Sequence, residues 1–125
     1  MASTEETVNI YSSKYGHVQE LTINEFDGNL LKTPLPTAGA IVYYAPWCPH
    51  CKEMAQDWED LGEMFYKKYL MYAVNCEKQL DICKVFKIRE YPTIKYFTKD
   101  GVIHDYKLPY NKFEFMNFIC NQVGI

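Results

Sequence analysis

Apolar residues recur along the chain with two different spacings, which predict strands that alternate with helices. Two continuous apolar runs, 40–45 and 70–74, predict central strands that are buried on both faces. Between these runs, apolar residues recur every three or four positions from Cys51 to Tyr69, so a long helix with one buried stripe is expected there. Residues 18–21 read as a further short strand.

The second half of the chain continues this alternation. Residues 80–86 read as a short helix, and 93–97 and 102–106 read as two strands joined by a hairpin turn at 99–101. Asn111 is expected to cap a final helix. The apolar positions expected on its buried face are Phe113, Met116, Phe118 and Ile119. The element order predicts an α/β fold, with a mixed central sheet and helices on both faces.

The start of the chain has a weaker pattern. Residues 1–16 are expected to form a polar N-terminal extension, and 17–125 the folded domain. Within the extension, residues 8–11 fit an added strand or a frayed tail equally well. Asn24 is expected to cap a helix over 26–31, which the following proline-rich segment would end.

Composition and charge exclude several classes of function. The 125 residues suffice for one domain, and 48% hydrophobic with 23% charged residues is ordinary for a globular protein. Sixteen acidic and thirteen basic residues give a net charge of −3, which supplies no basic surface for nucleic acid. No apolar run approaches about 18 residues, so no membrane span is expected.

The polar, acidic residues 1–7 do not resemble a secretory signal. We therefore expect a soluble, intracellular (cytoplasmic) monomer by default, with an oxidising compartment as the alternative for a processed chain.

Five cysteines carry the candidate chemistry: Cys48, Cys51, Cys76, Cys83 and Cys120. The first two form a Cys-x-x-Cys pair, which occurs both in redox sites and in zinc sites. Structural zinc usually needs a second such pair, which the chain lacks, so neither a metal nor another cofactor is expected.

The Cys-x-x-Cys pair lies where a predicted strand gives way to a predicted helix. The free N–H groups and the dipole at a helix N-terminus favour a thiolate at Cys48, and a protonated His50 would stabilise it further. Pro49 suits the first helical turn because its missing N–H would have no partner there. Cys51 falls on the inward stripe, within reach of Cys48 for a disulfide. This arrangement predicts reversible dithiol–disulfide exchange.

Two segments resemble a known family. The active site of thioredoxin-fold proteins, and of protein disulfide isomerase domains above all, is similar to Ala45-Pro46-Trp47-Cys48-Pro49-His50-Cys51-Lys52. The inner Pro-His pair resembles that of the bacterial periplasmic disulfide oxidases. Residues 88–97 resemble the isomerase segment around the cis-proline, and the resemblance extends from about residue 17 to the C-terminus.

The resemblance implies a thioredoxin-like fold and a substrate-binding rim. It implies that the Tyr91-Pro92 peptide bond is cis and faces the cysteine pair. Trp47, Tyr91 and Pro92 would then form an apolar rim around Cys48 that binds an extended substrate segment. Some isomerase-like domains have cysteines spaced like Cys76 and Cys83, which leaves a structural disulfide and two free thiols as alternatives.

The chain departs from the family at charged positions near the site. Val42 stands where the family has a buried acid, and Ala73 stands where it has the partner lysine. We therefore expect the usual proton acceptor of Cys51 to be missing. Glu90 replaces an isomerase glycine and would either disfavour the thiolate or act as a base. Arg89 matches an isomerase arginine proposed to approach the second cysteine, with a surface salt bridge as its alternative.

These residues and the resemblance together predict a thiol–disulfide oxidoreductase. It would act on protein thiols and disulfides, favouring disulfide formation or isomerisation, and would exchange electrons with an unknown redox partner protein. A thioredoxin-like reductase is one alternative. A substrate-binding adaptor domain with weak redox activity is the other, and the apolar residues at positions 42 and 73 motivate it.

Overall fold

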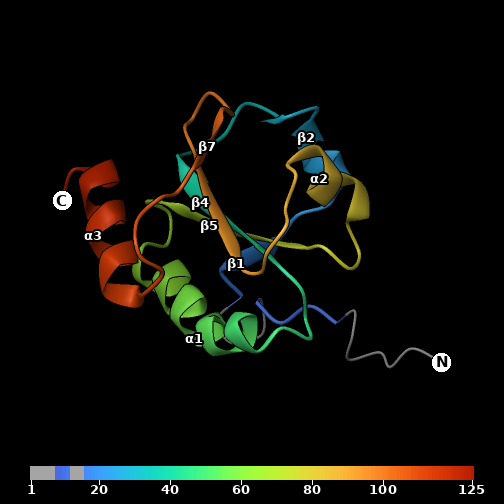
Figure 1. Ribbon diagram of the computed structural model, residues 1–125. Helices are drawn as coiled ribbons and strands as arrows, with labels where there is room; N and C mark the ends of the chain where they lie inside the picture. Colours follow the sequence, from blue (N-terminus) through green and yellow to red (C-terminus); the bar gives the residue numbers. More distant parts are fainter. Residues whose placement is uncertain (1–7, 12–15) are drawn as a thin grey trace.

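The computed structural model describes residues 8–11 and 16–125 (Figure 1). A five-stranded sheet forms its centre, and the spatial order is β1 (Val18–Glu20), β5 (Leu70–Asn75), β4 (Gly39–Tyr44), β6 (Thr93–Phe97) and β7 (Ile103–Asp105). β1, β5 and β4 run parallel, while β6 and β7 run antiparallel to their neighbours, which confirms the predicted mixed sheet.

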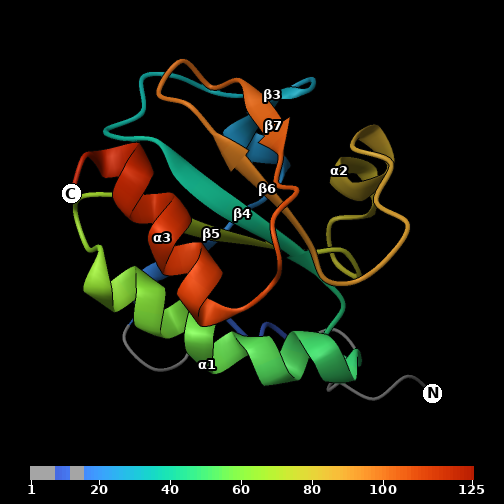
Figure 2. The same cartoon turned by 60° about the vertical axis from the view of Figure 1, so that its left-hand side comes forward.

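Helices cover both faces of this sheet, as the sequence predicts. The helices are α1 (Pro49–Met64), α2 (Leu80–Val85) and α3 (Lys112–Val123). α1 and α3 lie on one face and α2 on the other, as the two views in Figures 1 and 2 show. None of the helices in the described part of the chain is long and apolar enough to cross a membrane.

Strand β4 separates two hydrophobic clusters. All six of its residues are buried, because helices cover both of its faces. Val42 and Tyr44 belong to the cluster that packs against α1 and α3, while Ile41 and Tyr43 belong to the cluster beneath α2. The continuous apolar run 40–45 therefore supplies apolar side chains to both hydrophobic clusters, as a strand covered on both faces requires.

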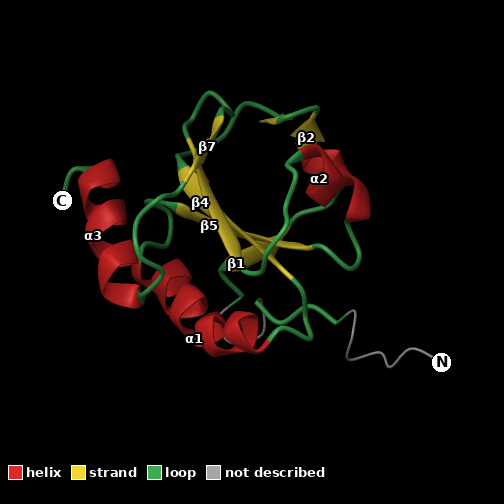
Figure 3. Cartoon of the chain, viewed as in Figure 1, coloured by secondary structure: helices red, strands yellow, loops and turns green. Residues whose placement is uncertain are grey.

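The prediction of a helix over 26–31 is wrong. These residues form the short antiparallel pair β2 (Phe26–Asp27) and β3 (Leu30–Leu31), drawn as strands in Figure 3. An Asp-Gly pair at the turn explains the difference, since Gly28 adopts a φ of +62°. The only helical turn nearby is the 3₁₀ helix η2 (Ile23–Glu25). Its N-cap is Thr22, not Asn24.

Two helices differ in detail from the prediction. α1 ends at Met64, so the apolar residues Phe65 and Tyr69 are buried outside the helix. In α3, Asn111 caps the helix through a 2.9 Å bond from the Glu114 N–H, as expected. Its buried face is rotated, however, because Phe115 is buried and Phe113 is 67% exposed.

The described part of the N-terminal segment is neither a strand nor a frayed tail. Residues 8–11 form no strand, yet Tyr11 is fully buried in the cluster beneath α1. Residues 1–7 and 12–15 lie outside the described residues, so the boundary at residue 16 stays a prediction.

Candidate active site

The junction between β4 and α1 positions Cys48. Cys48 is the N-cap of α1, with an extended backbone (φ −76°, ψ 121°), and Pro49 is the first helical residue. The Cys48 N–H donates to the Ala45 carbonyl, and the Cys48 carbonyl accepts the Lys52 N–H, both at 3.1 Å. Cys48 therefore lies at the positive end of the α1 dipole, as the sequence predicts.

Cys48 and Cys51 both carry free thiols in this structure, at different depths. Cys51 is fully buried, whereas Cys48 is 6% exposed. The Cys48 thiol is largely covered, and it faces the Tyr91 carbonyl at 3.5 Å. Burial, aided by the neighbouring Cys48 thiol, raises the pKa of Cys51 to about 12. Cys51 is consequently protonated at neutral pH.

The loop before β6 forms one side of the site. The Tyr91-Pro92 peptide bond is cis, as the resemblance implies. The Tyr91 ring contacts the edge of the Trp47 ring, with centroids 5.9 Å apart. Trp47 is 51% exposed, and its Nε1 donates to Glu77 Oε1 at 2.8 Å. Trp47 and Tyr91 thus form an apolar surface next to Cys48, held in part by an acid that the sequence analysis did not single out.

A cavity of about 260 Å³ lies between the start of α1 and the loop before α3. Its lining residues are His50, Glu53, Met54, Asp57, Pro92, Tyr110 and Asn111. The Tyr110 hydroxyl accepts the Ile94 N–H at 2.8 Å, which fixes the far wall of the cavity to β6. The structure therefore brings His50 and Pro92 to one open space, on two elements far apart in the sequence.

A polar network links residues of the N-terminal segment, β1 and β4 to the start of α1, and the sequence does not predict it. The Tyr11 hydroxyl donates to the Cys51 carbonyl at 2.7 Å. The Tyr11 ring packs edge-on against Tyr44, with centroids 4.6 Å apart, and the Tyr44 hydroxyl donates to the Glu20 carboxyl. Each partner comes from a different segment, and no local pattern in the sequence joins them.

The positions of the family's buried acid and lysine are apolar in the structure as well. Val42 and Ala73 are partners in the β4–β5 register, and both are fully buried. Neither side chain can take a proton from Cys51, so the family's usual acceptor is missing at these positions, as the sequence predicts.

Glu90 and Arg89 both lie on the surface, in front of β6. The Glu90 backbone carbonyl accepts the Thr93 hydroxyl at 2.7 Å. Burial raises the pKa of Tyr110, and the Glu90 carboxylate adds to this rise, so its charge acts on the loop before α3. Arg89 lines a shallow groove beside the second pair of cysteines.

That second pair, Cys76 and Cys83, is joined by a disulfide with a Cα–Cα distance of 5.8 Å. The disulfide ties the end of β5 to α2. Its groove of about 350 Å³ is lined by Cys76, Leu80, Cys83, Lys84, Lys87, Ile88, Arg89 and Tyr91. Of the two alternatives for these cysteines, the structure has the disulfide.

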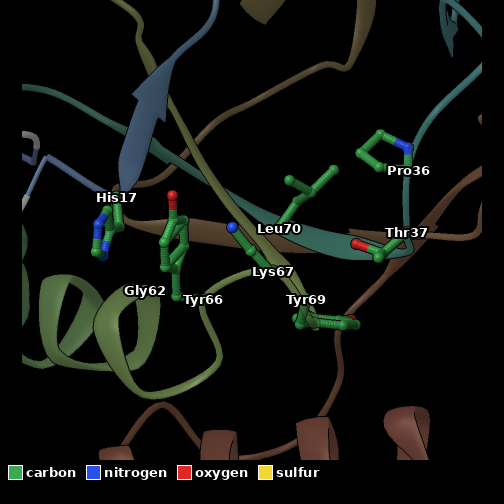
Figure 4. A pocket seen from close by; sticks show the side chains of 8 residues that line it. All are labelled: His17, Pro36, Thr37, Gly62, Tyr66, Lys67, Tyr69 and Leu70. Carbon is green, nitrogen blue, oxygen red and sulfur yellow. The ribbon is translucent and has the colours of Figure 1, made fainter.

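A further cavity of about 250 Å³ lies beside the C-terminal end of α1 (Figure 4). His17 stacks on Tyr66 at its edge, with centroids 3.9 Å apart, and pairs with Glu63 at 2.7 Å. No cysteine lines this cavity. Within the described ranges, no group of three or more His, Cys, Asp or Glu side chains is arranged to hold a metal ion.

Comparison with known proteins places this arrangement in a family. The family model named Thioredoxin matches residues 17–121. The chain belongs to the thioredoxin family. Among solved structures, the thioredoxin fold is shared with the J-Trx1 fragment of ERdj5, at a TM-score of 0.72 and 21% identity over 86% of this chain and 50% of that chain. A second solved structure with this fold is human ERp44, at a TM-score of 0.66 and 20% identity. The match covers 82% of this chain and 32% of that chain.

Curated relatives of this thioredoxin domain carry isomerase names. The protein disulfide-isomerase-like protein EhSep2 of Emiliania huxleyi is 38% identical over 109 residues, which cover 84% of this chain and 48% of the relative. The probable protein disulfide-isomerase ER-60 of Schistosoma mansoni is 30% identical over 110 residues, which cover 86% of this chain and 22% of the relative. The chain thus spans less than half the length of these two relatives.

Proposed function

We propose that this chain is a thiol–disulfide oxidoreductase that acts on cysteines of other proteins through Cys48 and Cys51. The observation that carries the proposal is the placement of two free thiols at the N-terminus of α1, one at the N-cap and one buried three residues later. The isomerase names of its relatives support the same activity.

In this proposal Cys48 is the nucleophile and Cys51 resolves the intermediate. In the reducing direction, the Cys48 thiolate attacks a substrate disulfide and forms a mixed disulfide, and Cys51 then displaces the substrate. In the oxidising direction, a substrate thiolate attacks Cys48 of the oxidised pair, and Cys51 leaves first. Pro49 fits the first helical position, and His50 stabilises the Cys48 thiolate when it is protonated.

The substrate would bind across the loop before β6. Trp47 and Tyr91 supply apolar surface, and Pro92 borders the cavity that also contains His50. An extended substrate segment can add its backbone to this loop in the manner of strand addition. We expect Glu90 and Arg89 to modulate the site from its rim, since both are exposed beside Tyr91.

We expect disulfide formation or isomerisation to be favoured over reduction. A resolving thiol whose pKa is about 12 attacks slowly, so the mixed disulfide with Cys48 persists long enough for a substrate to rearrange, which supports isomerisation. The Cys76–Cys83 disulfide and the isomerase names of the relatives support an oxidising compartment, where such bonds persist. The electron partner would be a redox protein of that compartment.

Two assays test this function with the same variants. Refolding of a scrambled disulfide protein and reduction of insulin are compared for the wild type, Cys48→Ser and Cys51→Ser. We expect both activities to vanish in Cys48→Ser, and Cys51→Ser to accumulate mixed disulfides. Activities in the wild type no higher than in Cys48→Ser would contradict the proposal and favour the adaptor domain.

A further inference from the structure

The groove of about 350 Å³ beside α2 reaches the candidate active site. Its lining comes from α2, from the turn after α2 and from the loop before β6. Tyr91 belongs to this lining, and its carbonyl also faces the Cys48 thiol at 3.5 Å. The Tyr91 ring contacts Trp47 as well. The groove is therefore continuous with the surface on which a substrate of Cys48 would lie.

The charged side chains that line this groove are all positive. They are Lys84, Lys87 and Arg89, and all three are exposed. None of the three forms an ion pair with an acid of residues 8–11 or 16–125. The acids nearest in the sequence do not line the groove: Glu77, Asp81 and Glu90. Three neighbouring cations without acidic partners favour an anionic occupant.

The turn after α2 holds these cations in place before a substrate binds. The Ile88 N–H donates to the Cys83 carbonyl at 3.0 Å, and a disulfide joins Cys83 to Cys76. The Lys87 N–H donates to the Lys84 carbonyl at 3.1 Å, and Lys87 has a φ of +54°. This left-handed backbone is uncommon for a residue with a long side chain, so a lysine at this position favours a functional role.

The other side of the Tyr91-Pro92 loop has the opposite charge. Pro92 lines the cavity at the start of α1, whose lining includes the acids Glu53 and Asp57 and no lysine or arginine. The cavity is on the side of α1 and α3, whereas α2 lies on the other face of the sheet (Figures 1 and 2). A segment that crosses this loop therefore meets cations on one side of its cysteine and acids on the other.

We propose that the groove beside α2 binds acidic side chains of a protein substrate, on one side of the substrate cysteine that reacts with Cys48. The glutamate or aspartate side chains pair with the three cations, while neighbouring apolar parts of the segment pack against Tyr91. The inference rests on the proposed function of the Cys48–Cys51 pair and adds the class of substrate that the site selects.

Synthetic peptides with a single cysteine test this preference. The peptide cysteine is joined by a disulfide to a thionitropyridyl group, which carries no charge in the peptide and absorbs light when it is released. Two glutamates, two glutamines or two lysines are placed before the cysteine in one series and after it in a second series. The series that shows the preference gives the direction of the bound segment.

The protein carries Cys51→Ser and Cys120→Ser, which leaves Cys48 as its free thiol. The Cys48 thiolate attacks the peptide sulfur and forms a mixed disulfide, and the bond to the thionitropyridyl sulfur breaks. The Cys48 sulfur is oxidised, and the leaving sulfur takes the electron pair and is reduced. Dividing the rate of the glutamate peptide by that of the glutamine peptide cancels any change in the thiolate fraction of Cys48.

We expect the glutamate peptide of one series to react about 3- to 10-fold faster than its glutamine counterpart at low salt, which two exposed ion pairs can supply. The lysine peptide of that series should not react faster than the glutamine peptide, although the net charge of −3 would by itself attract it. In about 1 M sodium chloride, where the Debye length is about 3 Å, the preference should largely vanish.

Paired substitutions locate the preference on the protein. Lys84→Gln combined with Lys87→Gln should lower the ratio of the glutamate to the glutamine rate to less than about half of the parent value, the loss of one or two exposed ion pairs. Lys32→Gln combined with Lys99→Gln is the matched control, because both lysines are exposed, neither lines the groove, and the net charge changes equally. This control should keep the parent ratio. Lys84→Arg combined with Lys87→Arg should keep it too, since the positive charges remain.

Three results would overturn the inference. One is an equal rate for the glutamate and glutamine peptides in both series. Another is a preference that Lys84→Gln with Lys87→Gln leaves unchanged. The third is loss of the preference in millimolar inorganic phosphate at constant ionic strength, because that identifies a site for small anions. A glutamine peptide that reacts with Cys48 no faster than with a free thiol would instead defeat the proposed function, and the inference with it.

Discussion

Replacing Glu20 by glutamine should change how the stability of the protein depends on pH. Glutamine keeps the size of the side chain and an oxygen that accepts the Tyr44 hydroxyl, but it does not titrate. Burial raises the pKa of Glu20 from its ordinary 4.5 to about 7 in the folded protein. Between these two values the folded state retains a proton that the unfolded chain loses, so the free energy of unfolding falls as the pH rises.

The size of this effect follows from the two pKa values. Each pKa unit corresponds to about 1.4 kcal/mol, so the wild type should lose about 3 kcal/mol between pH 4.5 and pH 7, relative to Glu20→Gln. Below pH 4.5 the carboxyl is protonated in both states, and above pH 7 it is ionised in both. The difference between the two proteins should therefore be flat outside this window.

Urea unfolding at a series of pH values from 4 to 9 measures this difference directly. All other titrating groups are shared by the two proteins, so subtracting one free energy of unfolding from the other isolates Glu20. A difference that stays constant from pH 4.5 to pH 7 would show that Glu20 is ionised at its ordinary pKa. The physical reasoning about its buried position would then be wrong.

Three further substitutions test the rest of the structure. Tyr11→Phe leaves the Cys51 carbonyl without its donor and should lower the free energy of unfolding by about 1 kcal/mol in urea. Replacing Cys76 and Cys83 together by serine opens a short loop and should cost about 2–3 kcal/mol, measured under non-reducing conditions. Trp58→Ala removes a fully buried ring and should cost about 3–5 kcal/mol, with a matching drop in the melting temperature.

The parts of the fold that the sequence predicts are those determined by local patterns. β4 is a continuous apolar run, and its burial on both faces is a direct consequence. Asn111 caps α3 because its side chain reaches an N–H three residues ahead, which is a short-range property. The helix predicted over 26–31 is wrong because the hydrophobic spacing fits a helix, while the Asp-Gly turn at Gly28 favours a hairpin.

The candidate site likewise contains one part that local sequence patterns predict and one part that depends on contacts between distant segments. The positions of Cys48 and Cys51 at the start of α1 follow from a strand, a proline and the helical spacing. The links from Tyr11 and Glu20 span 40 and 24 positions of the chain, and they form only once β1 lies beside β5. No periodicity in the sequence reports such contacts, so these hydrogen bonds cannot be predicted before the sheet register is known.

The central claim is that Cys48 and Cys51 interconvert between dithiol and disulfide, and equilibration with glutathione buffers tests it most directly. The fraction of oxidised protein is read by mass spectrometry after the free thiols are blocked with acid-quenched alkylation. We expect a single two-electron transition between Cys48 and Cys51, with a potential closer to about −180 mV than to about −270 mV. No disulfide between these two cysteines at any ratio of oxidised to reduced glutathione would contradict the account.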